Sequence, residues 1–392
     1  MKPKALLMTC CMVGLMTMNS QSHSEILGMM NYESKMPDQL KSLKIGDDGA
    51  RREGIAIIDL DPESSAFGKI ISDIPVSPDN ILHHIYYDRT MTKAYITGLA
   101  EPSLQVMDMT SNPFRVKQID VKGCVMAENV VFDEANENWY LTCMDSANVF
   151  VGKVASDEVT AEVKLPGTYP HGLAIHTGID RLIVTSTVSG DLTTPDDVVS
   201  IVRASDLKLL GQKQLSLTKG QSGAAPGEIV FVPGVSPPTA YVTNIFGATL
   251  WALTWDETRD DFIPSQIFDF NEIGSGTALE IYFNDKGDRL YVTTATPGHF
   301  HIFDIAHSPL NPKLISSIPT AEGAHHVGIT KDEKYAFVQN SFLNLPGLSD
   351  GSVTVINLKT QKLVTSMDTL KDTGFNPNSI ILLPEWNSFG GH

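Results

Sequence analysis

The stretch EIYFNDKGDRLYVTTA, residues 280–295, contains two short runs of β-branched and aromatic residues separated by a polar turn with Asn, Asp and Gly. This composition is typical of two strands joined in a β-hairpin. The chain contains further strand pairs of the same kind, at residues 84–99, 129–144, 172–187, 228–245 and 326–341. A seventh segment, SIILLP at 379–384, begins in the same way. The chain is therefore built from repeats of one structural unit.

These units begin 43 to 56 residues apart, and the additional residues of the longer units fall in loops. A third strand-like segment follows each pair, and a fourth closes most units. Four strands in about 45 residues are the signature of a β-propeller blade. One blade cannot bury both faces of its sheet, so the blades must pack in a ring. The sequence predicts an all-β fold, a seven-bladed β-propeller that forms a single domain over residues 25–392.

The last unit contributes only one strand of its blade, at 379–384. Three further strand-like segments lie near the N-terminus, at residues 25–32, 54–60 and 68–74. We therefore expect the C-terminal strand to pair with the N-terminal strands and close the ring.

Residues 1–22 have the pattern of a signal peptide. Lys2 and Lys4 precede an apolar stretch at 5–18, and polar residues follow it. This order of basic, apolar and small polar residues is typical of export signals, so we expect a periplasmic or secreted protein. A lipoprotein form and a soluble form both remain open. No other apolar run reaches transmembrane length, so the mature chain is expected to have no membrane span.

The chain has 46 acidic and 29 basic residues and a net charge of −17. Such a surface repels phosphate backbones, which argues against a nucleic-acid partner. Beyond the predicted signal peptide the only cysteines are Cys124 and Cys143. In an oxidising compartment a single pair is expected to form a disulfide. The alternative is that their thiolates bind a metal.

The first strand of a propeller blade is the innermost, so residues at its start meet around the central axis. Two neighbouring positions of each unit fall there: His83 and His84, Glu128 and Asn129, His171 and Gly172, Gly227 and Glu228, Leu279 and Glu280, His325 and His326, Asn378 and Ser379. Successive strand residues point to opposite sides, which favours one row facing the axis. The sequence does not tell which row this is. Turns at the start of a strand can break this alternation, so both rows are kept as candidates.

Imidazoles and carboxylates that converge from several blades suit a metal ion, and imidazole favours zinc, copper, iron or nickel over calcium and magnesium. The predicted ligands are His83, His84, His171, Glu228, Glu280, His325 and His326. Secondary candidates at the same hub are Glu128, Asn129 and Asn378. A water-filled polar tunnel and a pocket for a carboxylate ligand are the alternatives. The two glutamates among the predicted ligands could equally orient the histidines.

The segments AYVTN (240–244), LYVTT (290–294) and GSVTVINLKTQKLV (351–364) resemble the YVTN-repeat propellers. This resemblance covers essentially the whole mature chain. It implies the fold and leaves the function open, because one fold hosts many activities.

A narrower resemblance concerns the segments IPVSPDNILHHIYYD (74–88), FDIAHSPLNPKLISSI (303–318) and HHVGITKDEKYAFVQNSFLN (325–344). They are similar to the selenium-binding-protein and methanethiol-oxidase family, whose members are propellers with a histidine-bound copper that oxidises a small thiol. The resemblance implies that His83 and His84 are ligands and that His171 is a third candidate ligand. It also favours copper over zinc. It spans two or three blades, and the family's other histidine motif has no match here, which leaves thiol oxidation open.

Three hypotheses follow. The first is an exported copper protein that performs redox chemistry on a small molecule at the mouth of the central channel. The second is a non-enzymatic protein that binds a metal at the hub or a protein partner on a propeller face. The third is a lactonase- or lyase-type propeller enzyme that uses the same hub residues without redox chemistry.

Overall fold

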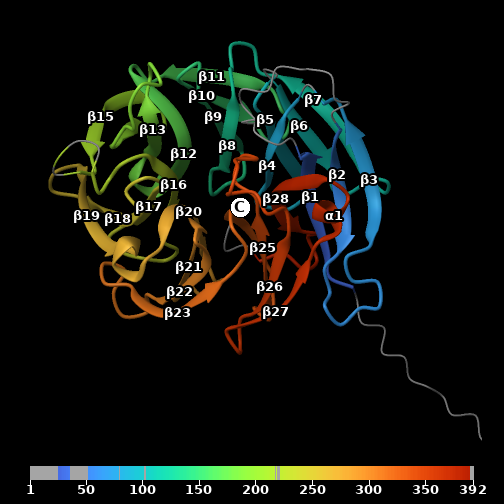
Figure 1. Cartoon of the computed structure of the whole chain (residues 1–392). Coiled ribbons are helices and arrows are strands. Elements are labelled where there is room, and N and C mark those ends of the chain that lie inside the picture. The colour runs from blue at the N-terminus through green and yellow to red at the C-terminus, as the bar shows by residue number, and fades with distance from the viewer. Residues whose placement is uncertain are drawn as a thin grey trace, which may run out of the picture.

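The computed structural model describes residues 25–35, 52–78, 80–100, 103–216, 218 and 221–388. These residues form seven four-stranded antiparallel sheets, arranged as blades around a ring (Figure 1). The prediction of an all-β, seven-bladed propeller is confirmed. The predicted signal peptide, 1–22, lies outside the described residues. Among the described residues no helix is long and apolar enough to span a bilayer.

The blade that closes the ring has the strand order β28 (Phe375–Leu382), β1 (Leu27–Ser34), β2 (Glu53–Asp59) and β3 (Ile70–Val76). Blade 1 contains β4 (Leu82–Tyr87), β5 (Lys93–Gly98), β6 (Ser103–Asp108) and β7 (Arg115–Asp120). Blade 2 contains β8 (Ala127–Phe132), β9 (Asn138–Cys143), β10 (Asn148–Lys153) and β11 (Val159–Lys164). Blade 3 contains β12 (Thr168–His176), β13 (Arg181–Ser189), β14 (Val198–Arg203) and β15 (Lys208–Gln214).

Blade 4 contains β16 (Pro226–Phe231), β17 (Thr239–Asn244), β18 (Thr249–Asp256) and β19 (Asp261–Asp269). Blade 5 contains β20 (Gly276–Phe283), β21 (Arg289–Thr296), β22 (Gly298–Asp304) and β23 (Lys313–Pro319). Blade 6 contains β24 (Ala324–Ile329), β25 (Tyr335–Asn340), β26 (Val353–Asn357) and β27 (Lys362–Met367). The described residues also include three short helical elements, η2 (Thr177–Ile179), η3 (Phe270–Ile273) and α1 (Thr369–Asp372).

The hydrophobic core lies between the blades. The inner strands β4 and β24 are buried along their whole length, whereas the outer strand β3 is mostly exposed. Tyr95 of blade 1 and Trp139 of blade 2 are both fully buried and belong to one apolar cluster. Each sheet therefore buries its faces against its two neighbours, as a ring of blades requires.

The two ends of the described chain meet in the closing blade. β28 and β1 pair antiparallel with Met30 opposite Ile380, and they lie side by side in Figure 1. One C-terminal strand and three N-terminal strands thus form one sheet. The predicted closure is confirmed.

Every inner strand carries a β-bulge at the position of the hub residues. In blade 1, Leu82 pairs with Gly98 and Ile85 pairs with Ile96, so two residues of β4 face a single residue of β5. The same shift occurs in the other blades, between Ala127 and Val130, Pro170 and Leu173, Pro226 and Ile229, Ala278 and Ile281, Ala324 and Val327, and opposite Asn31 and Tyr32 in the closing blade. A bulge breaks the alternation of side chains. Both candidate rows can therefore contribute to the hub, because the bulge breaks the alternation at the start of each inner strand.

At several bulges, a threonine of the second strand accepts a hydrogen bond from the bulge and donates one to the inner strand of the next blade. The Thr142 hydroxyl accepts from the Asn129 backbone N–H at 3.0 Å and donates to the His171 carbonyl at 2.6 Å. Thr185 connects Gly172 to Gly227 in the same way. The equivalent threonines are Thr97, Thr243 and Thr293, and Gln339 takes their place in blade 6. The Thr of the YVTN-like segments thus has a structural role at the hub.

Candidate metal centre

Two pairs of histidines meet at the hub from blades on either side of the closing blade. His83 and His84 come from β4, and His325 and His326 come from β24. The rings of His84 and His326 are 4.4 Å apart between centroids. One nitrogen of each of His84, His325 and His326 lies within 4.8 Å of the others, and all three residues are buried. Three imidazoles from two distant segments therefore form one compact set of donors.

Glu128 of β8 joins further histidines to this set. Its Oε1 lies 3.0 Å from Nε2 of His83 and 3.2 Å from Nε2 of His171, and 3.8 Å from Nε2 of His84. His83, His84 and Glu128 form a second group whose donor atoms lie within 4.8 Å of one another. His84 belongs to both groups and is the centre of the site. The sequence analysis ranked Glu128 as secondary, and the structure places it among the imidazoles.

Glu280 lies behind the other histidine pair. Its Oε1 is 3.2 Å from Nε2 of His325, and its Oε2 is 3.8 Å from Nδ1 of His326. Glu280 is in neither compact donor group. This geometry matches a carboxylate that fixes the orientation of ligating imidazoles.

The remaining predicted hub residues make other contacts around the axis. Glu228 Oε2 accepts from the Asn129 side-chain amide at 3.1 Å, and its Oε1 accepts from the Ile229 backbone N–H at 3.0 Å. The Asn378 amide donates to the Leu82 carbonyl at 3.1 Å. These three side chains belong to neither donor group and bond to one another or to the backbone around the axis.

Burial favours the neutral form of two hub histidines, which is the form that a metal needs. Burial, followed by the neighbouring imidazole His83, lowers the pKa of His84 well below its usual value. Burial also lowers the pKa of His171, although Glu128 opposes this. Among the described residues, Nε2 of His84 and Nδ1 of His325 have no hydrogen-bond partner. Buried imidazoles with such nitrogens fit a metal ion, because a ring nitrogen that carries no proton has a lone pair to donate.

Two tyrosines that the sequence analysis did not single out contact the same histidines. The Tyr86 hydroxyl lies 2.5 Å from Nδ1 of His84, and the Tyr282 hydroxyl lies 3.4 Å from Nδ1 of His326. When Nδ1 of His84 donates to Tyr86, Nε2 keeps the lone pair for a metal. Tyr86 and Tyr282 each lie two residues after a hub position, so the repeat register could have identified them.

Apolar residues cover one side of the histidines. The edge of the Phe342 ring packs on the His325 ring at 5.3 Å between centroids. Phe342 and Leu348, from the segment after β25, pack against a cluster that contains Ile245 and Leu279. The loop between β25 and β26 therefore places an apolar ring directly on His325.

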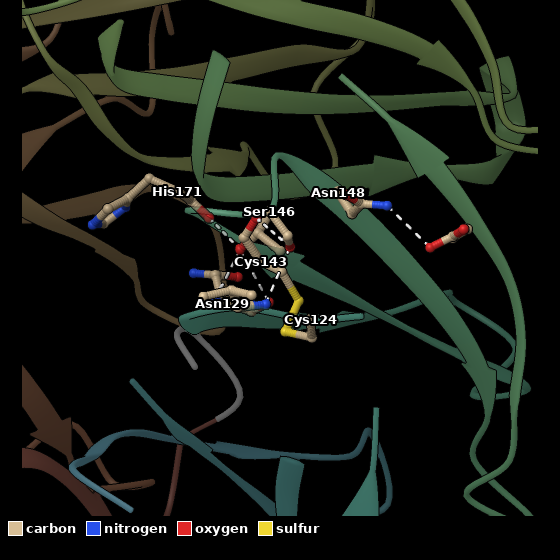
Figure 2. The surroundings of a disulfide bond; sticks show 9 residues. Cys124, Asn129, Cys143, Ser146, Asn148 and His171 are labelled. Atoms are coloured by element: carbon tan, nitrogen blue, oxygen red, sulfur yellow. Dashed lines mark hydrogen bonds between the residues drawn. A yellow bond between two sulfur atoms is a disulfide. The ribbon is translucent and has the colours of Figure 1, made fainter. Parts of the chain in front are cut away.

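Cys124 and Cys143 form a disulfide within blade 2, with their Cα atoms 5.3 Å apart. Figure 2 shows this bond beside Asn129, with His171 approaching from the next blade. Both sulfur atoms are engaged in the bond, so the structure gives no support to the alternative of thiolate ligands.

His301 is a buried histidine outside the hub. It lies on β22 and contacts the Thr294 hydroxyl at 3.0 Å and the Ser317 hydroxyl at 2.9 Å. Burial lowers its pKa to about 3. Both hydroxyls belong to its own blade, so His301 packs within blade 5.

The comparisons with known proteins concern the fold. No protein-family model and no curated protein matches the sequence. Among solved structures, a hypothetical selenium-binding protein from Sulfolobus tokodaii is similar with a TM-score of 0.73 and 11% identity, over 93% of this chain and 95% of that one. A proposed 6-phosphogluconolactonase from Bacteroides fragilis has a TM-score of 0.62 and 12% identity, over 93% and 99%. Hydrazine synthase from Kuenenia stuttgartiensis has a TM-score of 0.58 and 13% identity, over 79% and 92%.

At these identities the similarity shows the propeller fold alone. Membership of the YVTN-repeat family has no support from a family match. The chain is therefore a seven-bladed β-propeller with a His/Glu cluster at its hub that could hold a metal ion.

Proposed function

We propose that the hub binds a transition-metal ion. His84, His325 and His326 are the principal ligands, and His83 and Glu128 form an adjoining group of donors. The observation that supports this most directly is the convergence of three buried imidazole nitrogens within 4.8 Å from two separate blades. Glu280 orients two of these imidazoles, and the Phe342 ring packs on His325.

Copper is the metal that we propose. Imidazole donors suit copper and zinc alike, so the donor set alone does not choose between them. The resemblance of the HHIYYD segment to the selenium-binding-protein and methanethiol-oxidase family supports copper, and a protein named as selenium-binding has a similar fold.

With copper bound, the protein would oxidise a small molecule such as a thiol at the mouth of the channel, with dioxygen as the final acceptor of the electrons. The metal would supply the electron transfer, and the chain would supply the rest. His84, His325 and His326 hold the ion, Glu280 fixes two of the rings, and Glu128 lies 3.0 to 3.2 Å from His83 and His171 as a proton acceptor beside the site. We further propose that the protein is exported, which the Cys124–Cys143 disulfide supports because such bonds persist in oxidising compartments.

Metal content tests the proposal. We expect about one copper per wild-type chain after reconstitution, and a loss of that copper in a His84→Ala, His326→Ala double variant whose circular dichroism is unchanged. The matched control is His176→Ala, which removes a histidine at the end of β12 outside both donor groups and should keep the metal.

The outcomes separate the hypotheses. Copper with an optical and paramagnetic signature, and oxygen consumption with small thiols, would support the oxidase. Zinc or calcium with hydrolysis of a lactone would instead favour a lactonase-type enzyme. Failure of copper, zinc and calcium to bind the wild-type chain would overturn the metal site.

A further inference from the structure

The two donor groups at the hub share one histidine. The all-imidazole group consists of His84, His325 and His326, and the Glu128 group consists of His83, His84 and Glu128. Nδ1 of His84 lies 2.5 Å from the Tyr86 hydroxyl, so Nε2 is the nitrogen that remains for a metal. The lone pair of one ring nitrogen can bind only one ion at a time. The two groups are therefore alternative positions for a single ion and not two independent sites.

The distances within the Glu128 group are close to those around a bound ion. Oε1 of Glu128 lies 3.0 Å from Nε2 of His83 and 3.8 Å from Nε2 of His84. Two ligand atoms of a tetrahedral ion bound at about 2.0–2.1 Å are about 3.3 Å apart, so small movements of these side chains would enclose an ion. All three residues are buried. The Glu128 group is therefore a metal position in its own right.

The two groups differ in charge. The all-imidazole group offers ring nitrogens alone, whereas the other group includes the carboxylate of Glu128. By Coulomb's law a carboxylate attracts a dication about twice as strongly as a monocation at the same distance. Glu280 contacts the rings of His325 and His326, but it belongs to neither donor group. The Glu128 group therefore favours the ion with the higher charge.

The surroundings of the two groups differ in the same direction. The Phe342 ring packs on the His325 ring at 5.3 Å between centroids, and Phe342 and Leu348 belong to one apolar cluster. In the other group Glu128 also lies 3.2 Å from Nε2 of His171, whose side chain is 18% exposed. An apolar environment raises the cost of burying charge. It therefore disfavours a dication more than a monocation beside His325.

We propose that the two groups hold one copper ion in its two oxidation states. The Glu128 group holds Cu(II), and the all-imidazole group holds Cu(I). This inference rests on the proposed copper function. Mixed nitrogen and oxygen donors are typical of Cu(II), which agrees with the assignment. One electron from the substrate reduces Cu(II) to Cu(I), and dioxygen takes that electron back. Glu128 is a ligand in the oxidised state alone, so in the reduced state it is available as the proton acceptor beside the site.

The affinities for the two oxidation states test the proposal. Chelator competition measures Cu(II) in air and Cu(I) under ascorbate without oxygen. Loss of a residue that only supports a metal ligand usually costs 10–100-fold in affinity, so Glu128→Gln should weaken Cu(II) about ten-fold or more and change Cu(I) less than about two-fold. His325→Asn should do the reverse. A ten-fold change in the ratio of the two affinities shifts a one-electron potential by about 59 mV. Glu128→Gln should therefore raise the copper reduction potential by about this amount or more, and His325→Asn should lower it.

The electron paramagnetic resonance spectrum of Cu(II) reports its ligands directly. It should change in Glu128→Gln and stay as in the wild type in His325→Asn. Glu128→Asp keeps the carboxylate and should restore most of the preference for Cu(II), which separates ligation from misfolding. Glu228→Gln is the matched control, because it removes a hub carboxylate that lies outside both donor groups. Its reduction potential should stay nearer to the wild type than that of Glu128→Gln.

The outcomes distinguish this inference from the copper function on which it rests. Equal weakening of both oxidation states in Glu128→Gln and in His325→Asn would indicate one fixed site, and would overturn the inference while the copper function stands. Two copper ions per wild-type chain would also overturn it, as would a potential in Glu228→Gln as high as in Glu128→Gln. Failure of the wild-type chain to bind copper in either state would overturn the copper function and this inference together.

Discussion

Glu128 of blade 2 and Glu228 of blade 4 occupy the two neighbouring hub positions of the repeated unit, yet their carboxylates face different groups. Glu128 points at the imidazoles of His83 and His171, whereas Glu228 bonds to Asn129 and to the backbone of Ile229. The repeat register showed that these residues meet at the hub. It could not show which side chain faces which, because that depends on the bulge in each inner strand and on the packing between blades.

A single carboxylate also links two blades away from the hub. Asp157 of blade 2 is almost fully buried and contacts Lys93 at 2.9 Å, Lys117 at 2.6 Å and Tyr95 at 2.6 Å, all from blade 1. Burial opposes its charge, but the hydrogen bonds from Lys117, Tyr95 and Lys93 outweigh this and lower the pKa of Asp157 below 3.8. The folded protein therefore binds this proton less readily than the unfolded chain.

Asp157→Asn should lower the free energy of unfolding at pH 7 by about 1–2 kcal/mol, the usual scale for charge-assisted hydrogen bonds that solvent partly screens. A group whose folded pKa is depressed stabilises the protein above its unfolded pKa and loses that contribution as the pH falls through the folded value. The difference in the free energy of unfolding between variant and wild type should therefore reach its maximum above about pH 4 and decrease below it. Urea unfolding at pH 7 and pH 3 measures this.

The control is Asp206→Asn, which removes an exposed ion pair with Arg203 and should cost less than about 0.5 kcal/mol at either pH. A difference for Asp157→Asn that is as large at pH 3 as at pH 7 would contradict the ion-pair explanation.

At the level of the strand, the bulge and its threonine decide how the hub is built. Strand alternation predicts one inward row, and the bulge brings side chains of both rows into contact with Glu128. The sequence contained the relevant signal in the repeated Y-V-T and Y-L-T segments. The role of these threonines could not be predicted from the sequence, because threonine is common in strands. Only the register in the structure shows that the hydroxyl bonds to two blades.

Thr142→Val tests this role. The substitution keeps the shape of the side chain but leaves the Asn129 N–H and the His171 carbonyl without their buried partner. We expect a loss of about 2–4 kcal/mol in the free energy of unfolding, from two unsatisfied groups. Metal affinity should fall as well, because Glu128 precedes Asn129 and His171 carries the affected carbonyl. Urea unfolding and metal titration measure the two effects.

Thr254→Val is the matched control. The Thr254 hydroxyl is buried and has no hydrogen-bond partner among the described residues. Its replacement should leave stability unchanged or raise it slightly, with metal affinity intact. Equal losses in the two variants would show that the effect comes from the valine and not from the bulge.

On the scale of the whole molecule, the ring depends on strand pairing between the two ends of the described chain. Strand counting predicted this closure, because a unit with one strand and a region with three complement each other. The register of the pairing could not be counted in the same way, since the shift opposite Asn31 and Tyr32 is a local irregularity. In the structure, Ser34 pairs with Phe375 at the end of that ladder.

Ser34→Cys with Phe375→Cys tests both the closure and the register. The Lys35 N–H bonds to the Gly374 carbonyl, so the neighbouring pair Ser34 and Phe375 is a non-hydrogen-bonded one. Such pairs have Cα atoms about 4.5 Å apart, within the range that a disulfide spans. A bond there would close a loop of almost the whole described chain. In the chain-entropy account it would stabilise the folded state by up to about 5 kcal/mol.

We therefore expect the double variant to form the bond on air oxidation and to unfold at higher urea than its reduced form, while the Ser34→Cys single variant shows no such gain. Shifting one cysteine by a residue, to Asn376, should prevent the bond, because side chains one position along a strand point to the opposite face. If the shifted pair oxidised as readily as the first, or if the oxidised protein were no more stable than the reduced one, the two ends would not be held in the described register. The closing blade would then not be what keeps the seven sheets, and the histidines they carry to the axis, in one ring.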